Sequence, residues 1–101
     1  MIDTIPELSI EEAKQKIDAG EVVIIDLRDE EDFEQGSIPG AIHVDKCGFY
    51  DFIEEIDKDQ AILICCYKGN RSRKMIPRFL DKGFTTLYNL KGGFKAWQEN
   101  Q

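Results

Sequence analysis

Histidine is nearly absent from this chain, and its scarcity limits the chemistry available to a functional site. His43 is the only histidine among 101 residues, so no Cys/His cluster has the spacing of metal ligands. We therefore expect no metal site. Long apolar runs are also lacking, and no segment is long enough to span a bilayer. Residues 1–7 have neither the basic start nor the apolar stretch of a secretory signal, so we expect a cytoplasmic protein that has no membrane partner.

Cysteine is scarce as well, and its arrangement does not suit a structural disulfide. The chain has three cysteines, and two of them, Cys65 and Cys66, are adjacent, which is poor disulfide geometry. Reduced thiols in a reducing compartment are the better interpretation. We interpret Cys65 as a small buried side chain that faces away from Cys66, and Cys47 as an incidental free thiol rather than a resolving cysteine.

Acidic residues are missing from one part of an otherwise acidic chain. The sequence has 13 Lys and Arg against 20 Asp and Glu, a formal net charge of -7, yet residues 61–80 contain no Asp or Glu. The cations of that segment are Lys68, Arg71, Arg73, Lys74 and Arg78. A cationic region on an acidic body favours a small anionic substrate and disfavours nucleic acid.

Apolar and polar periodicity predicts alternating strands and helices with no linker or repeat, hence one domain over residues 1–101. Ser9 and Glu12 form a capping box that opens a helix closed by Gly20. The other expected helices cover residues 31–35 (capped by Asp29), 49–56 and 72–81, with a last one starting at Gly92 and Gly93. The expected strands cover residues 22–27, 41–44, 61–64 and 85–88. This order predicts an α/β fold with a mostly parallel central sheet flanked by helices on both faces.

The segment from Ala61 to Ser72 is the most informative stretch of the chain. A buried strand ends near Cys66, and a loop follows whose Gly and Asn can turn successive backbone N–H groups toward one point. Its residues are Tyr67, Lys68, Gly69, Asn70, Arg71 and Ser72. Ser72 is a candidate N-cap for the next helix, and Pro77 predicts a kink or a later start of that helix. Converging N–H groups, a helix N-terminus and two cations favour a thiolate at Cys66.

Three separated segments resemble the signatures of rhodanese-like domains. Residues 26–43 resemble the amino-terminal signature, residues 66–72 the active-site loop, and residues 90–97 the carboxy-terminal signature. Ser37 departs from the pattern, because many members have a histidine there. By this resemblance Asp26 and Arg28 are a framework pair that fixes a strand end, and His43 is structural rather than a general base.

The resemblance implies a thiosulfate sulfurtransferase that needs no cofactor. Cys66 would take the outer sulfur of thiosulfate, or of another sulfane donor, as a persulfide. A thiol, an acceptor protein or cyanide would then remove that sulfur. Lys68 and Arg71 would hold the anionic donor.

Two alternatives remain open from the residues alone. Counting from Cys65 gives Cys65-x5-Arg71-Ser72, the spacing of cysteine phosphatases and of related arsenate reductases. Against this reading, Ile64 stands where a histidine would precede the nucleophile, and no general acid is evident nearby. The second alternative is a regulatory module that uses the fold without turnover.

Overall fold

Ser9 begins the first helix through the predicted capping box. In the computed structural model, Ser9 Oγ accepts a hydrogen bond from the Glu12 N–H at 3.1 Å, and Glu12 Oε1 accepts one from the Ser9 N–H at 3.2 Å. The structure describes residues 6–44, 48–67 and 70–100, and for residues 49, 50 and 70–74 the backbone alone. Helix α1 (Ile10–Asp18) therefore starts where its local sequence predicts.

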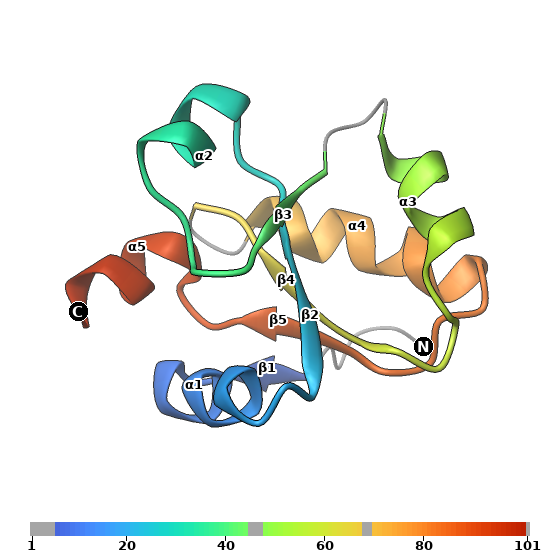
Figure 1. Cartoon of the computed structure of the whole chain (residues 1–101), viewed down its shortest axis with the longest axis horizontal. Coiled ribbons are helices and arrows are strands. Elements are labelled where there is room, and N and C mark those ends of the chain that lie inside the picture. The colour runs from blue at the N-terminus through green and yellow to red at the C-terminus, as the bar shows by residue number, and fades with distance from the viewer. Residues whose placement is uncertain (1–5, 45–47, 68–69, 101) are drawn as a thin grey trace.

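Strands and helices alternate along the whole described chain (Figure 1). The strands are β1 (Glu7–Leu8), β2 (Val22–Asp26), β3 (Ile42–His43), β4 (Ala61–Cys65) and β5 (Leu87–Leu90). The helices after α1 are α2 (Glu30–Gln35), α3 (Phe49–Glu55), α4 (Asn70–Asp81) and α5 (Gly93–Glu99). No helix of the described chain has both the length and the apolar character needed to cross a membrane.

The strands form one parallel sheet in the order β1-β5-β4-β2-β3. β4 lies at its centre and pairs with β2 from Val22 opposite Ala61 to Asp26 opposite Cys65. Parallel strands need helical crossovers, and in such sheets ligands bind beyond the carboxyl ends of the strands. The predicted α/β class with a parallel sheet is confirmed.

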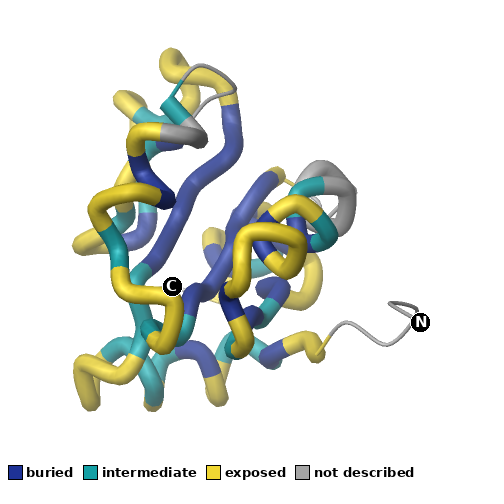
Figure 2. Tube along the Cα trace, turned by 90° about the vertical axis from the view of Figure 1, so that its right-hand side faces the viewer, coloured by how far each residue is buried: buried dark blue, intermediate teal, exposed yellow. Residues whose placement is uncertain are grey.

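Two hydrophobic clusters cover the two faces of the sheet. On one face, Ile62 and Ile64 of β4 pack with side chains of α3 and α4, including Phe52 and Phe79. On the other face, Leu63 packs with side chains of α1 and α5; that cluster comprises Leu8, Ala13, Ile24, Ile38, Leu63, Cys65, Leu90, Phe94 and Trp97. Figure 2 shows the buried residues running through the middle of the molecule, between outer segments that are exposed. Helices therefore flank both faces, as the sequence predicts.

Helix α4 differs from the sequence prediction at its start. It begins at Asn70, so Ser72 lies inside its first turn and is not the N-cap. Pro77 lies within the helix, so of the kink or later start predicted from it, the later start is wrong. Proline removes one backbone hydrogen bond there. The buried neighbours Ile76 and Phe79, 2% and 0% exposed, supply packing that offsets this loss.

Strand β5 lies two residues later than predicted, at Leu87–Leu90 instead of residues 85–88. Its second half pairs with β1, where Glu7 is opposite Asn89 and Leu8 opposite Leu90. Asparagine is depleted in strands. The side-chain amide of Asn89 donates to Glu7 Oε2 at 3.2 Å, so this polar side chain has a partner inside the sheet. β1 was not predicted, because two residues carry no periodicity.

Candidate active site

Cys66 lies directly after the carboxyl end of the central strand β4. Side chains alternate along the strand, so Cys66 belongs to the same cluster as Ile62 and Ile64, and Cys65 belongs to the opposite one. Cys66 is only 3% exposed. The predicted opposite orientation of the two cysteines is confirmed, and Cys47 lies outside the described residues.

Cys65 sits in surroundings that keep it a thiol. Its side chain is fully buried, and its Sγ donates to the Cys66 carbonyl oxygen at 3.6 Å. Burial raises the pKa of the Cys65 thiol strongly, and the negative charge of Asp26 raises it further, although the Arg28 guanidinium opposes this. Cys65 is therefore unsuited to act as a thiolate nucleophile at neutral pH.

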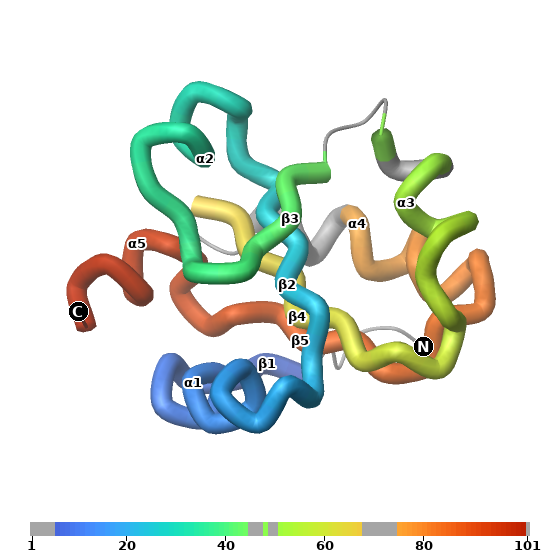
Figure 3. The backbone as a smooth tube through the Cα atoms, viewed as in Figure 1, coloured from blue at the N-terminus to red at the C-terminus, as the bar shows by residue number. Residues whose placement is uncertain are grey.

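The start of α5 holds the backbone on both sides of the Cys66–Tyr67 junction. The Phe94 N–H donates to the Cys66 carbonyl at 2.7 Å, and the Lys95 N–H donates to the Tyr67 carbonyl at 3.0 Å. In Figure 3 the chain after β4 passes beside the first turn of α5. A trans peptide unit points its N–H opposite to its C=O. The Tyr67 N–H therefore points away from α5.

Gly93 makes this close approach feasible. It has φ +63°, and a Cβ built on it would lie 2.5 Å from the Tyr67 carbonyl oxygen and closer still to that of Cys66. Only glycine tolerates both the left-handed backbone and the contact. The sequence marked Gly92 and Gly93 as the start of a helix, but it did not reveal that Gly93 contacts the loop. Two adjacent glycines before an aromatic residue are the only local sign of it.

The remaining residues of the predicted loop are described in part. Lys68 and Gly69 lie outside the described residues. Asn70, Arg71 and Ser72 form the start of α4, where the backbone alone is described. The cationic cradle around Cys66 thus stays a prediction from sequence.

Asp26 and Arg28 form the predicted ion pair at the end of β2. Arg28 Nε lies 3.0 Å from both carboxylate oxygens of Asp26, and Nη2 lies 2.7 Å from Oδ2. The Arg28 N–H also donates to Asp26 Oδ1 at 2.9 Å. Both residues are buried, at 0% and 7% exposure. Because the Leu27 N–H between them donates to the Cys65 carbonyl at 2.8 Å, this turn is fixed to the end of β4.

Two further contacts tie Arg28 to its surroundings. Its Nη2 donates to the Gly36 carbonyl at 2.6 Å, and its guanidinium lies 3.8 Å from the ring centre of Phe94. His43 Nε2 lies 2.7 Å from the Arg28 carbonyl. A carbonyl only accepts, so Nε2 is the protonated nitrogen. This contact agrees with a structural role for His43.

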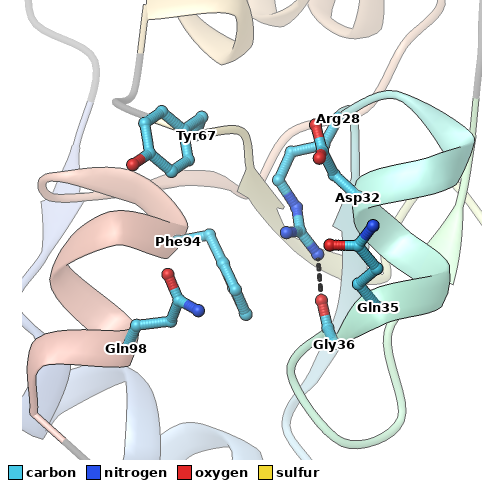
Figure 4. Close-up of a pocket in the computed structure, with 7 residues that line it drawn as sticks. All are labelled: Arg28, Asp32, Gln35, Gly36, Tyr67, Phe94 and Gln98. Carbon is cyan, nitrogen blue, oxygen red and sulfur yellow. Dashed lines mark hydrogen bonds between the residues drawn. The ribbon is translucent and has the colours of Figure 1, made fainter.

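A pocket of about 410 Å³ opens beside the Cys66–Tyr67 junction, between α2 and α5 (Figure 4). It is lined by Arg28, Asp32, Gln35, Gly36, Tyr67, Phe94 and Gln98. Tyr67 is half exposed, whereas Arg28 and Phe94 are buried beneath the rim. Among the residues that the structure describes, no group of His, Cys, Asp and Glu side chains could hold a metal ion.

Comparison with known proteins agrees with this arrangement. A model of the rhodanese-like domain matches residues 9–100. The thiosulfate sulfurtransferase GlpE of Pseudomonas aeruginosa (strain LESB58) is 37% identical over 98 residues, which cover 97% of this chain and 88% of that protein.

Solved structures share the fold. The human single-domain sulfurtransferase TSTD1 superposes with a TM-score of 0.86 at 19% identity, over 97% of this chain and 99% of that one. Reduced CoADR-RHD of Bacillus anthracis superposes with a TM-score of 0.80 at 28% identity, over 92% of this chain but only 16% of that longer one. On the match over residues 9–100 and the likeness to GlpE, this chain belongs to the rhodanese-like family.

Proposed function

We propose that this protein is a sulfurtransferase that carries sulfane sulfur from thiosulfate, or a related donor, to a thiol or cyanide through a persulfide on Cys66. Membership of the family and the likeness to GlpE support sulfurtransferase activity in general. The observation that carries the assignment to Cys66 is its place at the carboxyl end of the central strand, where the start of α5 fixes its carbonyl.

The first half-reaction is a displacement at sulfur. The Cys66 thiolate attacks the outer sulfur of thiosulfate, a new S–S bond forms, and the bond to the sulfonate sulfur breaks. Sulfite leaves with that bonding pair. Cys66 then carries a persulfide anion, so charge and atoms balance without an oxidant or a cofactor.

Backbone N–H groups and cations would stabilise the charges of this step. The Tyr67 N–H points away from α5, and we assign it to the cradle of the thiolate and of the outer persulfide sulfur. From the sequence we assign the N–H groups from Lys68 to Ser72 to the same cradle. Arg71 and Lys68 would hold the sulfonate and the departing sulfite.

The second half-reaction returns Cys66 to its starting state. A thiol attacks the outer persulfide sulfur, the Cys66 thiolate leaves, and the proton of the thiol ends on the product persulfide. Cyanide removes the same sulfur and leaves as thiocyanate.

We also propose that residues 1–101 form one rhodanese-like domain and that it acts in the cytoplasm, because a reducing compartment protects Cys66 from oxidation to a disulfide.

Intact mass spectrometry after thiosulfate treatment tests the assignment. We expect the protein to gain the mass of one sulfur atom, and Cys66→Ser to abolish both this gain and thiocyanate formation from cyanide. Cys65→Ala should retain both the gain of one sulfur atom and the formation of thiocyanate. If Cys65 proved essential and Cys66 dispensable, or if no sulfur were gained, the sulfurtransferase proposal would fail in favour of the phosphatase-like or the non-catalytic alternative.

A further inference from the structure

The two peptide groups that flank Cys66 are held from different parts of the fold. The group before it is held by the turn after β2, because the Leu27 N–H donates to the Cys65 carbonyl at 2.8 Å. The group after it is held by α5, because the Phe94 N–H donates to the Cys66 carbonyl at 2.7 Å. Peptide groups are planar, so the two backbone torsions of Cys66 lie between these planes. Fixing both planes therefore fixes the direction in which the Cys66 side chain leaves the backbone.

Arg28 joins the two segments that hold these peptide groups. It follows Leu27 directly in the chain, and its guanidinium lies 3.8 Å from the ring centre of Phe94. Figure 4 shows the guanidinium beside the Phe94 ring, between α2 and α5. A planar guanidinium stacks on an aromatic ring through cation–π attraction and dispersion. This contact, the Arg28–Phe94 stack, connects the turn after β2 with the start of α5.

The guanidinium is itself fixed by other partners. Its Nε and Nη2 contact the carboxylate oxygens of Asp26, and Nη2 also donates to the Gly36 carbonyl at 2.6 Å. Asp26 and Arg28 are both buried. A buried guanidinium with several directional hydrogen bonds has little freedom to turn. The Arg28–Phe94 stack therefore holds the start of α5 against a fixed group.

Arg28 is poorly placed to touch the sulfur donor. Two of its three guanidinium nitrogens are engaged by Asp26 and Gly36, and Phe94 lies against the guanidinium plane. Cys66 is not among the residues that line the pocket beside Arg28. The Cys66 side chain also belongs to the cluster on the opposite face of the sheet from Phe94. Arg28 can therefore act on Cys66 through the backbone and not through the substrate.

We propose that Arg28 and Phe94 are positioning residues for sulfur transfer: their stack holds the two peptide groups that flank Cys66 and thereby aims its sulfur. The inference rests on the proposed sulfurtransferase function. It goes beyond a framework role, because it assigns the stack an effect on rate as well as on stability. Attack on the donor needs the thiolate aligned with the bond that breaks. The Tyr67 N–H, which belongs to the second peptide group, must also keep facing the sulfur.

Single-turnover sulfur transfer from thiosulfate tests the proposal, with Phe94→Leu as the first variant. Leucine keeps the backbone N–H and a large apolar side chain but has no ring for the guanidinium. We expect the maximal rate of persulfide formation to fall about tenfold, because displacement of a reacting group by a fraction of 1 Å has effects of this order. The half-saturating thiosulfate concentration should stay within about twofold of the parent value, since the cations that we assign to the donor, Lys68 and Arg71, are unchanged.

Phe84→Leu is the matched control. Phe84 is equally buried, and Lys58 Nζ lies 4.5 Å from its ring centre, so this variant also loses a cation–ring contact. Phe84 lies toward the opposite end of the sheet, where the Thr86 carbonyl accepts the Ile62 N–H near the start of β4. The variant should lose unfolding free energy as Phe94→Leu does, but its maximal rate should match the parent protein. If Phe94→Leu transferred sulfur as fast as Phe84→Leu, the stack would be structural only and the positioning role would be overturned.

Arg28→Lys tests the other half of the stack. Lysine keeps the positive charge but loses the planar group, so the maximal rate should fall as in Phe94→Leu. The double variant Arg28→Lys/Phe94→Leu should be no slower than the slower single variant, because both substitutions break one contact. Multiplying effects on the maximal rate would overturn the proposal, since the two residues would then act independently.

Hydrogen exchange separates failure of this proposal from failure of the sulfurtransferase function, because it needs no sulfur transfer. In Phe94→Leu the backbone N–H groups of Leu27 and of residue 94 should exchange about tenfold faster relative to that of Leu63, a fully buried residue at the sheet centre. Phe84→Leu should leave both relative rates unchanged. If the parent protein transferred no sulfur, the proposed function would fail, and these exchange rates would still show whether the stack holds the backbone of Cys66. Unchanged relative exchange at both positions in Phe94→Leu would overturn the inference.

Discussion

Gly93 and Cys66 meet through backbone atoms so closely that no side chain fits between them. A Cβ on Gly93 would overlap the carbonyl oxygens of both Cys66 and Tyr67, and these carbonyls accept the Phe94 and Lys95 N–H groups. The position of α5 and the orientation of the Cys66–Tyr67 peptide are therefore coupled. A shift of α5 should therefore move the backbone of the proposed nucleophile Cys66.

Gly93→Ala should lower sulfur transfer by more than tenfold while the protein still folds. The loop backbone must move away from the new methyl group, and a displacement approaching 1 Å at a reacting centre costs up to about a hundredfold in rate. The left-handed backbone adds roughly 1–2 kcal/mol of destabilisation. Thiosulfate-dependent turnover and urea unfolding measure the two effects separately.

Gly40→Ala is the matched control for backbone strain. Gly40 has φ +87°, and a Cβ there would meet nothing within 4 Å. It should lose similar stability and keep its kcat and its rate of Cys66 alkylation. If Gly93→Ala changed activity no more than Gly40→Ala does, the close contact with Cys66 would be structural only.

Sequence reasoning predicted the parts of the fold that local signals specify. The Ser9–Glu12 capping box, the buried strand before Cys66 and the α/β order all follow from short-range patterns. It missed β1, whose two residues pair with β5 across more than eighty positions. It also placed the start of α4 at Ser72, because a serine before an amphipathic stretch resembles an N-cap.

Some features of the candidate site could likewise be predicted from the sequence, and others could not. Cys66 and the Asp26–Arg28 pair could be found from sequence, since both lie at strand ends within recognisable segments. The contact between Gly93 and the Cys66 carbonyl could not be found from the sequence, because it joins residues far apart in the chain. The pocket between α2 and α5 could not be found either, because it depends on how these two helices are placed on the sheet.

The stability contributed by Cys65 should decline at alkaline pH. Burial raises the pKa of Cys65 in the folded state, whereas in the unfolded chain a thiol ionises near pH 8.5, so above that pH the folded state holds the extra proton. The free energy of unfolding then falls by up to about 1.4 kcal/mol per pH unit. Cys65→Ala removes this pH-dependent component together with some packing, and the packing loss does not depend on pH.

Urea unfolding of both proteins in reductant, at several values between about pH 7 and pH 10, measures this effect. The stability advantage of the parent protein over Cys65→Ala should be constant below about pH 8 and shrink above it. A pH-independent difference would contradict the raised pKa. Cys66 and Cys47 are unchanged in the variant, so the comparison isolates Cys65.

Asp26→Asn should be strongly destabilising. The substitution leaves the Arg28 guanidinium buried without its counter-charge, and loss of one partner of a buried pair costs about 3–5 kcal/mol. The control is Glu21→Gln, which breaks the solvent-accessible pair with the partly exposed Lys16 and should cost less than about 1 kcal/mol. Equal losses of unfolding free energy in the two variants would show that the buried pair is not a framework element.

Arg71→Ala should lower kcat/KM for thiosulfate and should change the other properties of the protein less. If Arg71 holds the sulfonate, losing its charged hydrogen bond costs about 1.5–3 kcal/mol in kcat/KM for thiosulfate. Arg78→Ala is the matched control, because Arg78 is exposed in the last turn of the same helix. Arg78→Ala should have little effect on kcat/KM for thiosulfate.

Added salt should lower kcat/KM for thiosulfate in the parent protein and in Arg78→Ala, whereas Arg71→Ala should respond less, since an ionic contact is already lost. Unfolding free energies should stay close to that of the parent. Equal kinetics for all three proteins at low salt would mean that the cations of this helix form a solvated face and that the donor binds elsewhere.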